Sequence, residues 1–107
     1  MDDIQIEPKE LKVKLDTGAK VLVVDVREPW EVQIASIAGA TLVPLNSLPA
    51  NMKLFDGAEE VVIFCHHGMR SLNAAAWLRS QGVDGARSLT GGIERWSTEI
   101  DPSVPHY

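Results

Sequence analysis

The segment FCHHGMRS, residues 64–71, holds the side chains of this chain best suited to chemistry. It contains Cys65, the only cysteine, with a glycine three positions later and an arginine five positions later. A cysteine reacts as its thiolate, which is favoured beside a cation or the start of a helix. Gly68 lets the backbone turn tightly, so the loop amides can point inward and bind an anion. These residues predict a nucleophile in a small anion-binding loop, against the alternative that Cys65 is a small buried core residue.

The elements on either side of Cys65 place it where such folds bind ligands. VVIF, residues 61–64, is a short apolar run typical of a buried strand, and SLNAAAWLRSQG, residues 71–82, is typical of a helix. Ligands of open α/β sheets bind beyond the carboxyl ends of the strands. Cys65 therefore follows a strand at the expected position of a site.

The rest of the chain alternates in the same way. Strands are predicted at 4–6, 21–26, 41–45, 61–64 and within 86–92. Helices are predicted at 8–18, 71–82 and 93–100, a short helix and turn at 28–40, and a capped helical turn at 46–57. Alternating strands and helices predict an α/β domain with a mostly parallel sheet flanked by helices. With 107 residues, the chain is expected to form a single domain over residues 1–107.

The composition excludes several classes of function. A net charge of -5 and the absence of a basic run argue against nucleic acid or an acidic membrane surface as partner. No apolar stretch approaches the length of a membrane span, and the acidic amino-terminal residues do not resemble a signal peptide. A single cysteine allows no internal disulfide, so we expect a cytoplasmic protein.

Three motifs resemble those of one family. CHHGMRS is similar to the active-site loop of rhodanese-like sulfurtransferases, a Cys-x-x-Gly-x-Arg-Ser pattern between a strand and a helix. VVDVREPWEVQIASIAGATLVPL (23–45) resembles the upstream motif of this family, and LTGGIERWSTEIDPSVPHY (89–107) resembles its glycine–tryptophan motif and tail. The resemblance implies a five-stranded parallel sheet flanked by helices. It also implies an enzyme whose cysteine takes sulfane sulfur from a donor such as thiosulfate and passes it, as a persulfide, to cyanide or a thiol.

Two other functions compete with this one. Phosphatases that share the fold have a Cys-x5-Arg loop, whereas Cys65 and Arg70 are separated by four residues, which leaves a smaller cradle suited to sulfur. The second alternative is a carrier module that accepts sulfur from a protein partner with little thiosulfate turnover. Because the chain has no second cysteine, a persulfide on Cys65 must pass its sulfur to an external acceptor, which predicts ping-pong kinetics.

The remaining site residues are assigned by position. The predicted substrate loop comprises His66, His67, Gly68, Met69, Arg70 and Ser71, in which the arginine attracts an anionic donor and steadies the thiolate. Asp25 and Arg27 are expected to support the site as an ion pair.

No cofactor or metal is expected. Adjacent histidines are expected to point in different directions, and no second cysteine or nearby carboxylate completes a ligand set in the sequence. Trp30, Trp77 and Trp96 are predicted to be packing residues.

Overall fold

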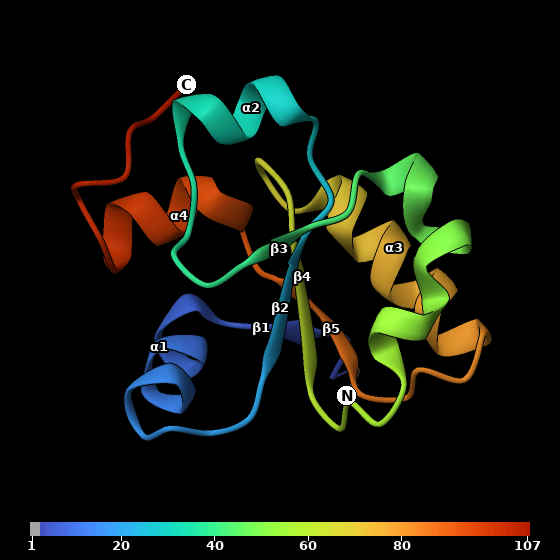
Figure 1. Ribbon diagram of the computed structural model, residues 1–107. Coiled ribbons are helices and arrows are strands. Elements are labelled where there is room, and N and C mark those ends of the chain that lie inside the picture. The colour runs from blue at the N-terminus through green and yellow to red at the C-terminus, as the bar shows by residue number, and fades with distance from the viewer. Residues whose placement is uncertain (1–2) are drawn as a thin grey trace.

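The computed structural model describes residues 3–107 and shows a five-stranded sheet with helices around it (Figure 1). The strands are β1 (Gln5–Ile6), β2 (Leu22–Asp25), β3 (Thr41–Leu42), β4 (Val61–Phe64) and β5 (Ala86–Leu89). They lie in the order β1-β5-β4-β2-β3, and all four pairings are parallel. The predicted α/β class and five-stranded parallel sheet are confirmed, and β4, which leads into Cys65, is the central strand.

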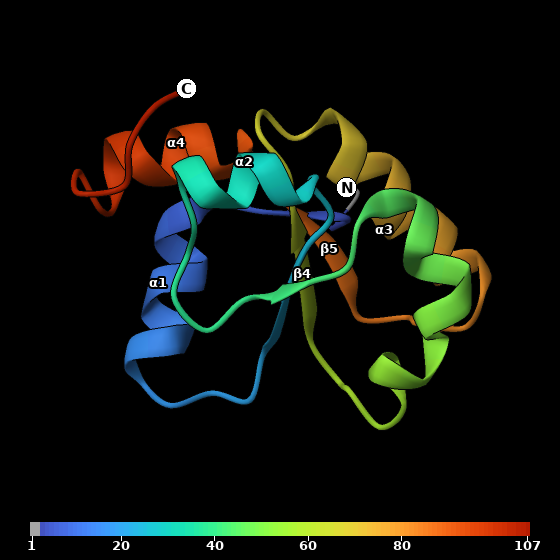
Figure 2. The ribbon, with the colours of Figure 1, turned by 45° about the horizontal axis from the view of Figure 1, so that its top comes forward.

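The helices cover both faces of the sheet (Figures 1 and 2). They are α1 (Pro8–Asp16), α2 (Pro29–Ile34), α3 (Met69–Ser80) and α4 (Gly92–Glu99), with a 3-10 segment, η1, over Leu45–Phe55. One apolar core joins α3 and η1 to the sheet, and a second joins α1 and α4 to its other face. Successive residues of β2 and β4 enter opposite cores, which explains why both strands are apolar runs without alternation. No helix in the described range has the length and apolar character needed to cross a membrane.

The helix after Cys65 differs from its predicted start, whereas the segment at 28–40 agrees with its prediction. α3 begins at Met69, two residues before the predicted start, because Gly68 with φ of 110° closes the preceding turn. The short helix and turn predicted over 28–40 are confirmed, with α2 over Pro29–Ile34 and a turn at residues 38–39. The helix ends at Ile34 because Ala35 is extended, and the Ala35 carbonyl accepts a hydrogen bond from Arg27 Nη2 at 2.7 Å. Local helix patterns could not reveal this buried tertiary acceptor.

The segment predicted as a helical turn at 46–57 forms the 3-10 segment η1. Its backbone departs from helical angles at Asn51, where φ is -123°, and Pro49 supplies no amide hydrogen. η1 nevertheless buries Leu48 and Phe55 against the α3 side of the sheet. The predicted strand at 41–45 is shorter, Thr41–Leu42, although the Val43 amide still donates to the Asp25 carbonyl at 2.8 Å.

Candidate active site

Cys65 lies directly after β4, and its sulfur is enclosed by its own loop. The residue is 1% exposed. Its Sγ accepts a hydrogen bond from the Gly68 amide at 3.1 Å and a longer one from the Ser71 amide at 3.4 Å. These two amides point inward at one sulfur, and such an arrangement can stabilise negative charge on it. The burial of Cys65 alone does not distinguish a core residue from a nucleophile, but these polar contacts are unlike those of an apolar core position.

Two buried hydroxyls lie behind the sulfur. Ser71 Oγ is 3.4 Å from Cys65 Sγ and 2.7 Å from Ser88 Oγ, and both serines are almost completely buried. The Gly68 carbonyl accepts a hydrogen bond from Ser71 Oγ at 3.2 Å and a weaker one from Ser88 Oγ at 3.5 Å. When the Ser88 hydroxyl donates to Ser71 Oγ, the single hydrogen of the Ser71 hydroxyl can turn from the Gly68 carbonyl to a Cys65 thiolate. Ser88 belongs to β5, so no local motif around Cys65 could identify it.

We therefore expect Ser88→Ala to weaken the stabilisation of a Cys65 thiolate. Loss of one buried hydrogen bond costs about 0.5–1.5 kcal/mol, which corresponds to a few-fold to tenfold slower alkylation of Cys65 by iodoacetamide at neutral pH. Ser80→Ala removes an exposed hydroxyl at the far end of α3 and serves as the matched control. Equal alkylation rates in the two variants would show that Ser88 does not support the thiolate.

Arg70 reaches across the site to a carboxylate of α2. Its Nη1 and Nη2 donate to Glu31 Oε2 and Oε1, both at 2.8 Å, in a two-pronged ion pair. The Arg70 guanidinium lowers the pKa of Glu31 from its ordinary 4.5 to about 2. Arg70 was predicted as part of the substrate loop, but its partner could not be predicted, because Glu31 precedes it by 39 residues.

A second ion pair lies beneath the first. Arg27 is 0% exposed, and its Nη2 and Nε donate to Asp25 Oδ2 at 2.7 Å and Oδ1 at 2.9 Å. The expected ion pair between these two residues therefore forms. Tyr107 connects this ion pair to Glu31. The Tyr107 hydroxyl accepts a hydrogen bond from Arg27 Nη1 and donates one to Glu31 Oε1, each at 2.9 Å.

The Glu31–Arg70 pair predicts a specific dependence of stability on pH. Because the folded-state pKa of Glu31 is below its unfolded value, the pair stabilises the fold fully above pH 4.5, and this contribution is lost as the pH falls through about 2. Since Arg70 is 37% exposed and partly screened by water, we expect Glu31→Gln to cost only about 1–3 kcal/mol at neutral pH.

Urea unfolding of the parent protein and of Glu31→Gln over this pH range measures the effect. The difference in unfolding free energy between them should shrink from its full value above pH 4.5 toward zero near pH 2. A difference that stays constant over the range would mean that this ion pair does not carry the pH dependence.

The two loop histidines form a stack, which corrects the expectation that they point in different directions. The His66 ring lies 3.8 Å from that of His67, with 24° between their planes, and 3.8 Å from that of Tyr107, with 6°. His66 Nε2 is buried without a hydrogen-bond partner, alone in this respect among the side chains of residues 3–107. Burial, followed by the proximity of His67, lowers the pKa of His66, so the ring is neutral at neutral pH.

A carboxylate lies near the stack, which corrects the expectation that none does. Glu94 Oε1 is 3.9 Å from His66 Nε2, and candidate ligand atoms of His66, His67 and Glu94 all lie within 4.8 Å of one another. Imidazole lone pairs lie in the plane of the ring, however, and the planes of the two stacked rings are separate and only 24° apart. A metal ion held by both would have to lie well outside each ring plane. In this arrangement the three residues do not present converging ligands.

The whole domain around this site is similar to a known protein family. The model of the rhodanese-like domain matches residues 7–99 of the chain. The chain belongs to the rhodanese-like domain family. A sulfurtransferase of Allochromatium vinosum is 34% identical over 94% of this chain and 94% of its own length. A rhodanese-related protein from Thermoplasma volcanium, whose structure is solved, has a TM-score of 0.81 and 29% identity, over 96% of this chain and 98% of its own.

Other relatives of this rhodanese-like domain are much longer proteins. The chloroplastic rhodanese-like/PpiC domain-containing protein 12 of Arabidopsis thaliana is 36% identical over 98% of this chain, but the match spans 37% of its length. The probable adenylyltransferase/sulfurtransferase MoeZ of Mycobacterium tuberculosis is 35% identical over 95% of this chain, and the match spans 26% of its length. The relatives support a transferase of sulfur. The activities of the longer proteins do not transfer to this domain from the match alone.

The surface of this rhodanese-like domain is partly apolar near Cys65. Met69, in the predicted substrate loop, is 71% exposed. Trp30 is 60% exposed and meets Tyr107 edge to face, with ring centroids 6.3 Å apart, so its prediction as a packing residue is wrong. Trp96, in α4, is 5% exposed and lies in the core on that side of the sheet, as predicted, and Trp77 packs against the other core. A hollow of about 270 Å³ beside the loop is lined by residues that include His67, Met69 and Ser88.

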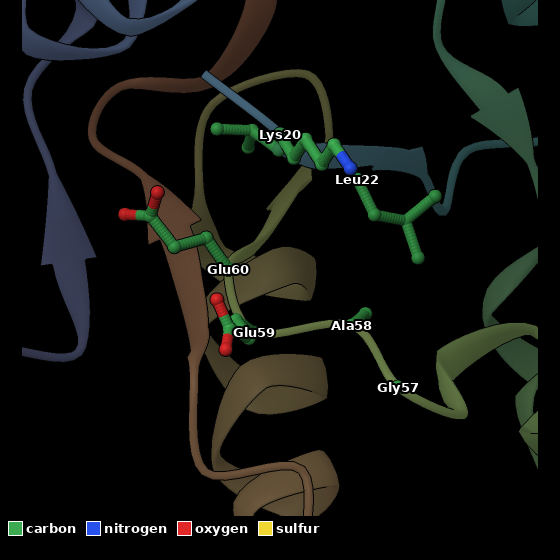
Figure 3. A pocket seen from close by; sticks show the side chains of 7 residues that line it. Lys20, Leu22, Gly57, Ala58, Glu59 and Glu60 are labelled. Carbon is green, nitrogen blue, oxygen red and sulfur yellow. The ribbon is translucent and has the colours of Figure 1, made fainter.

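A larger hollow, of about 580 Å³, lies where β2 and β4 begin, at the opposite end of the strands from Cys65. Figure 3 shows its lining, which includes Lys20, Glu59 and Glu60. Glu60 is already paired with Lys14 at 2.8 Å and with Arg87 at 3.6 Å. None of the residues predicted for the site lines this hollow, so its size does not make it the candidate site.

Proposed function

We propose that this rhodanese-like domain is a sulfurtransferase that carries sulfane sulfur as a persulfide on Cys65. The observation that supports this most strongly is the pair of amides, from Gly68 and Ser71, that donate to Sγ at 3.1 and 3.4 Å. They stabilise negative charge on the sulfur of the thiolate and again on that atom when the persulfide is cleaved.

The proposed reaction has two half-reactions. The Cys65 thiolate attacks the outer sulfur of thiosulfate, the sulfur–sulfur bond of thiosulfate breaks, and sulfite leaves with the bonding electrons. Cyanide or a thiolate then attacks the outer sulfur of the Cys65 persulfide. The bond within the persulfide breaks, the acceptor leaves with the sulfur, and the Cys65 thiolate is restored. No oxidant or reductant is consumed, and no cofactor is required.

Arg70 is proposed to attract the anionic donor. Its side chain is 37% exposed, and the ion pair with Glu31 fixes the direction of the guanidinium without occupying all five of its N–H groups. The short Cys65–Arg70 spacing supports transfer of a single sulfur over phosphate hydrolysis, because Sγ already occupies the inward amides of the loop.

Steady-state assay of thiosulfate:cyanide transfer tests this proposal. We expect thiocyanate formation with ping-pong kinetics. Phosphomonoester hydrolysis that depends on Cys65, without thiosulfate turnover, would contradict it.

The second candidate is a sulfur relay in which a protein delivers or receives the sulfur. Two observations favour it: Met69 presents a 71% exposed apolar side chain beside the loop, and MoeZ carries a related segment in a longer protein named as an adenylyltransferase/sulfurtransferase. Comparing sulfur loading of Cys65 by thiosulfate with loading by a cysteine desulfurase separates the two. Efficient loading by the desulfurase alone would favour the relay.

A further inference from the structure

Tyr107 contacts three parts of the site although it comes 42 positions after Cys65. Its ring stacks on His66 with a centroid distance of 3.8 Å, and its hydroxyl joins Arg27 to Glu31 with two hydrogen bonds of 2.9 Å. The guanidinium carbon of Arg27 lies 5.7 Å from the centre of the same ring. This tail residue is therefore fixed by both its polar and its aromatic parts.

The hydroxyl of Tyr107 acts on the carboxylate that holds Arg70. It donates to Glu31 Oε1, the same oxygen that accepts from Arg70 Nη2 at 2.8 Å. The Glu31 side chain is 4% exposed, so water cannot replace a lost donor easily. The Glu28 amide donates to the other oxygen, Oε2, at 2.9 Å. Without the Tyr107 hydroxyl, only the Glu28 amide would hold the Glu31 carboxylate in place, apart from Arg70 itself. The carboxylate and Arg70 could then move together.

The ring of Tyr107 fixes the loop at the residue next to the nucleophile. The His66 ring lies between the rings of Tyr107 and His67. The backbone of His66 is held as well, because its carbonyl accepts a hydrogen bond from the Glu94 amide at 3.1 Å. The ring and the hydroxyl thus act on two different features of the site, the loop itself and the cation at its mouth.

We propose that Tyr107 is a positioning residue that holds Arg70, through Glu31, where it attracts an anionic reagent to Cys65. This inference rests on the proposed function only in taking Cys65 as the nucleophile and an anion as its donor. In this role Tyr107 favours anionic donors over neutral ones, whereas a residue that only packs would not affect this preference.

Alkylation of Cys65 by two reagents of similar size tests this role directly. Iodoacetate is an anion and iodoacetamide is neutral, and both react with the same thiolate, so the ratio of their rates cancels the thiolate fraction. A residue that positions Arg70 changes this ratio, whereas general loosening of the loop changes both rates in parallel. Because alkylation requires no sulfur transfer, the test is informative even if the proposed function fails.

Arg70→Ala defines the ratio without the cation, and Tyr107→Phe removes only the hydroxyl while keeping the ring. We expect Tyr107→Phe to lower the iodoacetate-to-iodoacetamide ratio several-fold, up to about tenfold for a lost hydrogen bond to a charged group, toward the Arg70→Ala value. Trp30→Ala, which removes an exposed ring at the edge of Tyr107, should keep the parental ratio.

Two results would overturn the inference. The first is a parental ratio in Tyr107→Phe, whether both rates stay the same or change in parallel. The second is an Arg70→Ala ratio equal to that of the parent, which would show that the arginine attracts no anion.

Discussion

Replacing Cys65 with serine is expected to abolish sulfur transfer, with a loss of at least about a thousandfold in turnover. An alcohol in this position cannot form a persulfide, and the chain has no other cysteine to substitute for it. Serine differs from cysteine by one atom, so it preserves the packing of a position that is 1% exposed. The measurement is thiocyanate formation from thiosulfate and cyanide by the parent and variant proteins.

The control for this prediction is the stability of the variant. Thermal unfolding of Cys65→Ser should remain close to that of the parent, because a serine hydroxyl can use the Gly68 and Ser71 amides that bind Sγ. Turnover within tenfold of the parental value in a folded Cys65→Ser protein would show that sulfur transfer does not pass through this residue.

The second large effect is expected from Gly92→Ala, which acts on the loop from α4. Gly92 has φ of 63°, and a Cβ at this position would lie 2.4 Å from the His66 carbonyl oxygen and 2.6 Å from that of Cys65. These carbonyls accept hydrogen bonds from the Glu94 and Ile93 amides at 3.1 and 2.9 Å. The methyl group would therefore force the start of α4 away from the backbone of the loop.

Gly57→Ala separates this overlap from simple backbone strain. Gly57 has φ of 75°, but a Cβ there would meet no atom within 4 Å. We expect Gly57→Ala to cost about 1–2 kcal/mol for its left-handed backbone, and Gly92→Ala to cost more than about 4 kcal/mol. Urea unfolding of both variants measures the difference, and equal costs would show that the close approach of α4 to the loop is not important for the fold.

The fold could be predicted, and Cys65 could be singled out as a candidate nucleophile, because the signals for both are local. VVIF is uniformly apolar since β4 is buried on both faces, and Gly68 closes the turn that starts α3. Asp25 and Arg27 are two residues apart, so their pairing could be expected from position alone. Three motifs spread over the chain added the family, which the match to residues 7–99 then established.

The partners of the site residues could not be predicted because they come from distant elements. Glu31 is on α2, Ser88 is on β5 and Tyr107 is in the tail, and each reaches the loop only when the sheet is assembled. The sequence around Glu31 is typical of the exposed start of a helix, and Tyr107 lies in a proline-containing tail. Neither sequence context predicts that the two side chains are in contact. Glu94 could not be predicted for the same reason. It lies on α4, and only the folded chain brings this helix within 3.9 Å of His66.

The mass of Cys65 after treatment with thiosulfate tests the central proposal most directly. Intact-protein and peptide mass spectrometry of the parent should show an added mass of one sulfur atom on Cys65, which cyanide then removes with release of thiocyanate. Cys65→Ser, treated in the same way, should gain no mass. A parent protein that carries no sulfur on Cys65 after incubation with either thiosulfate or a cysteine desulfurase and its substrate would contradict the proposed chemistry.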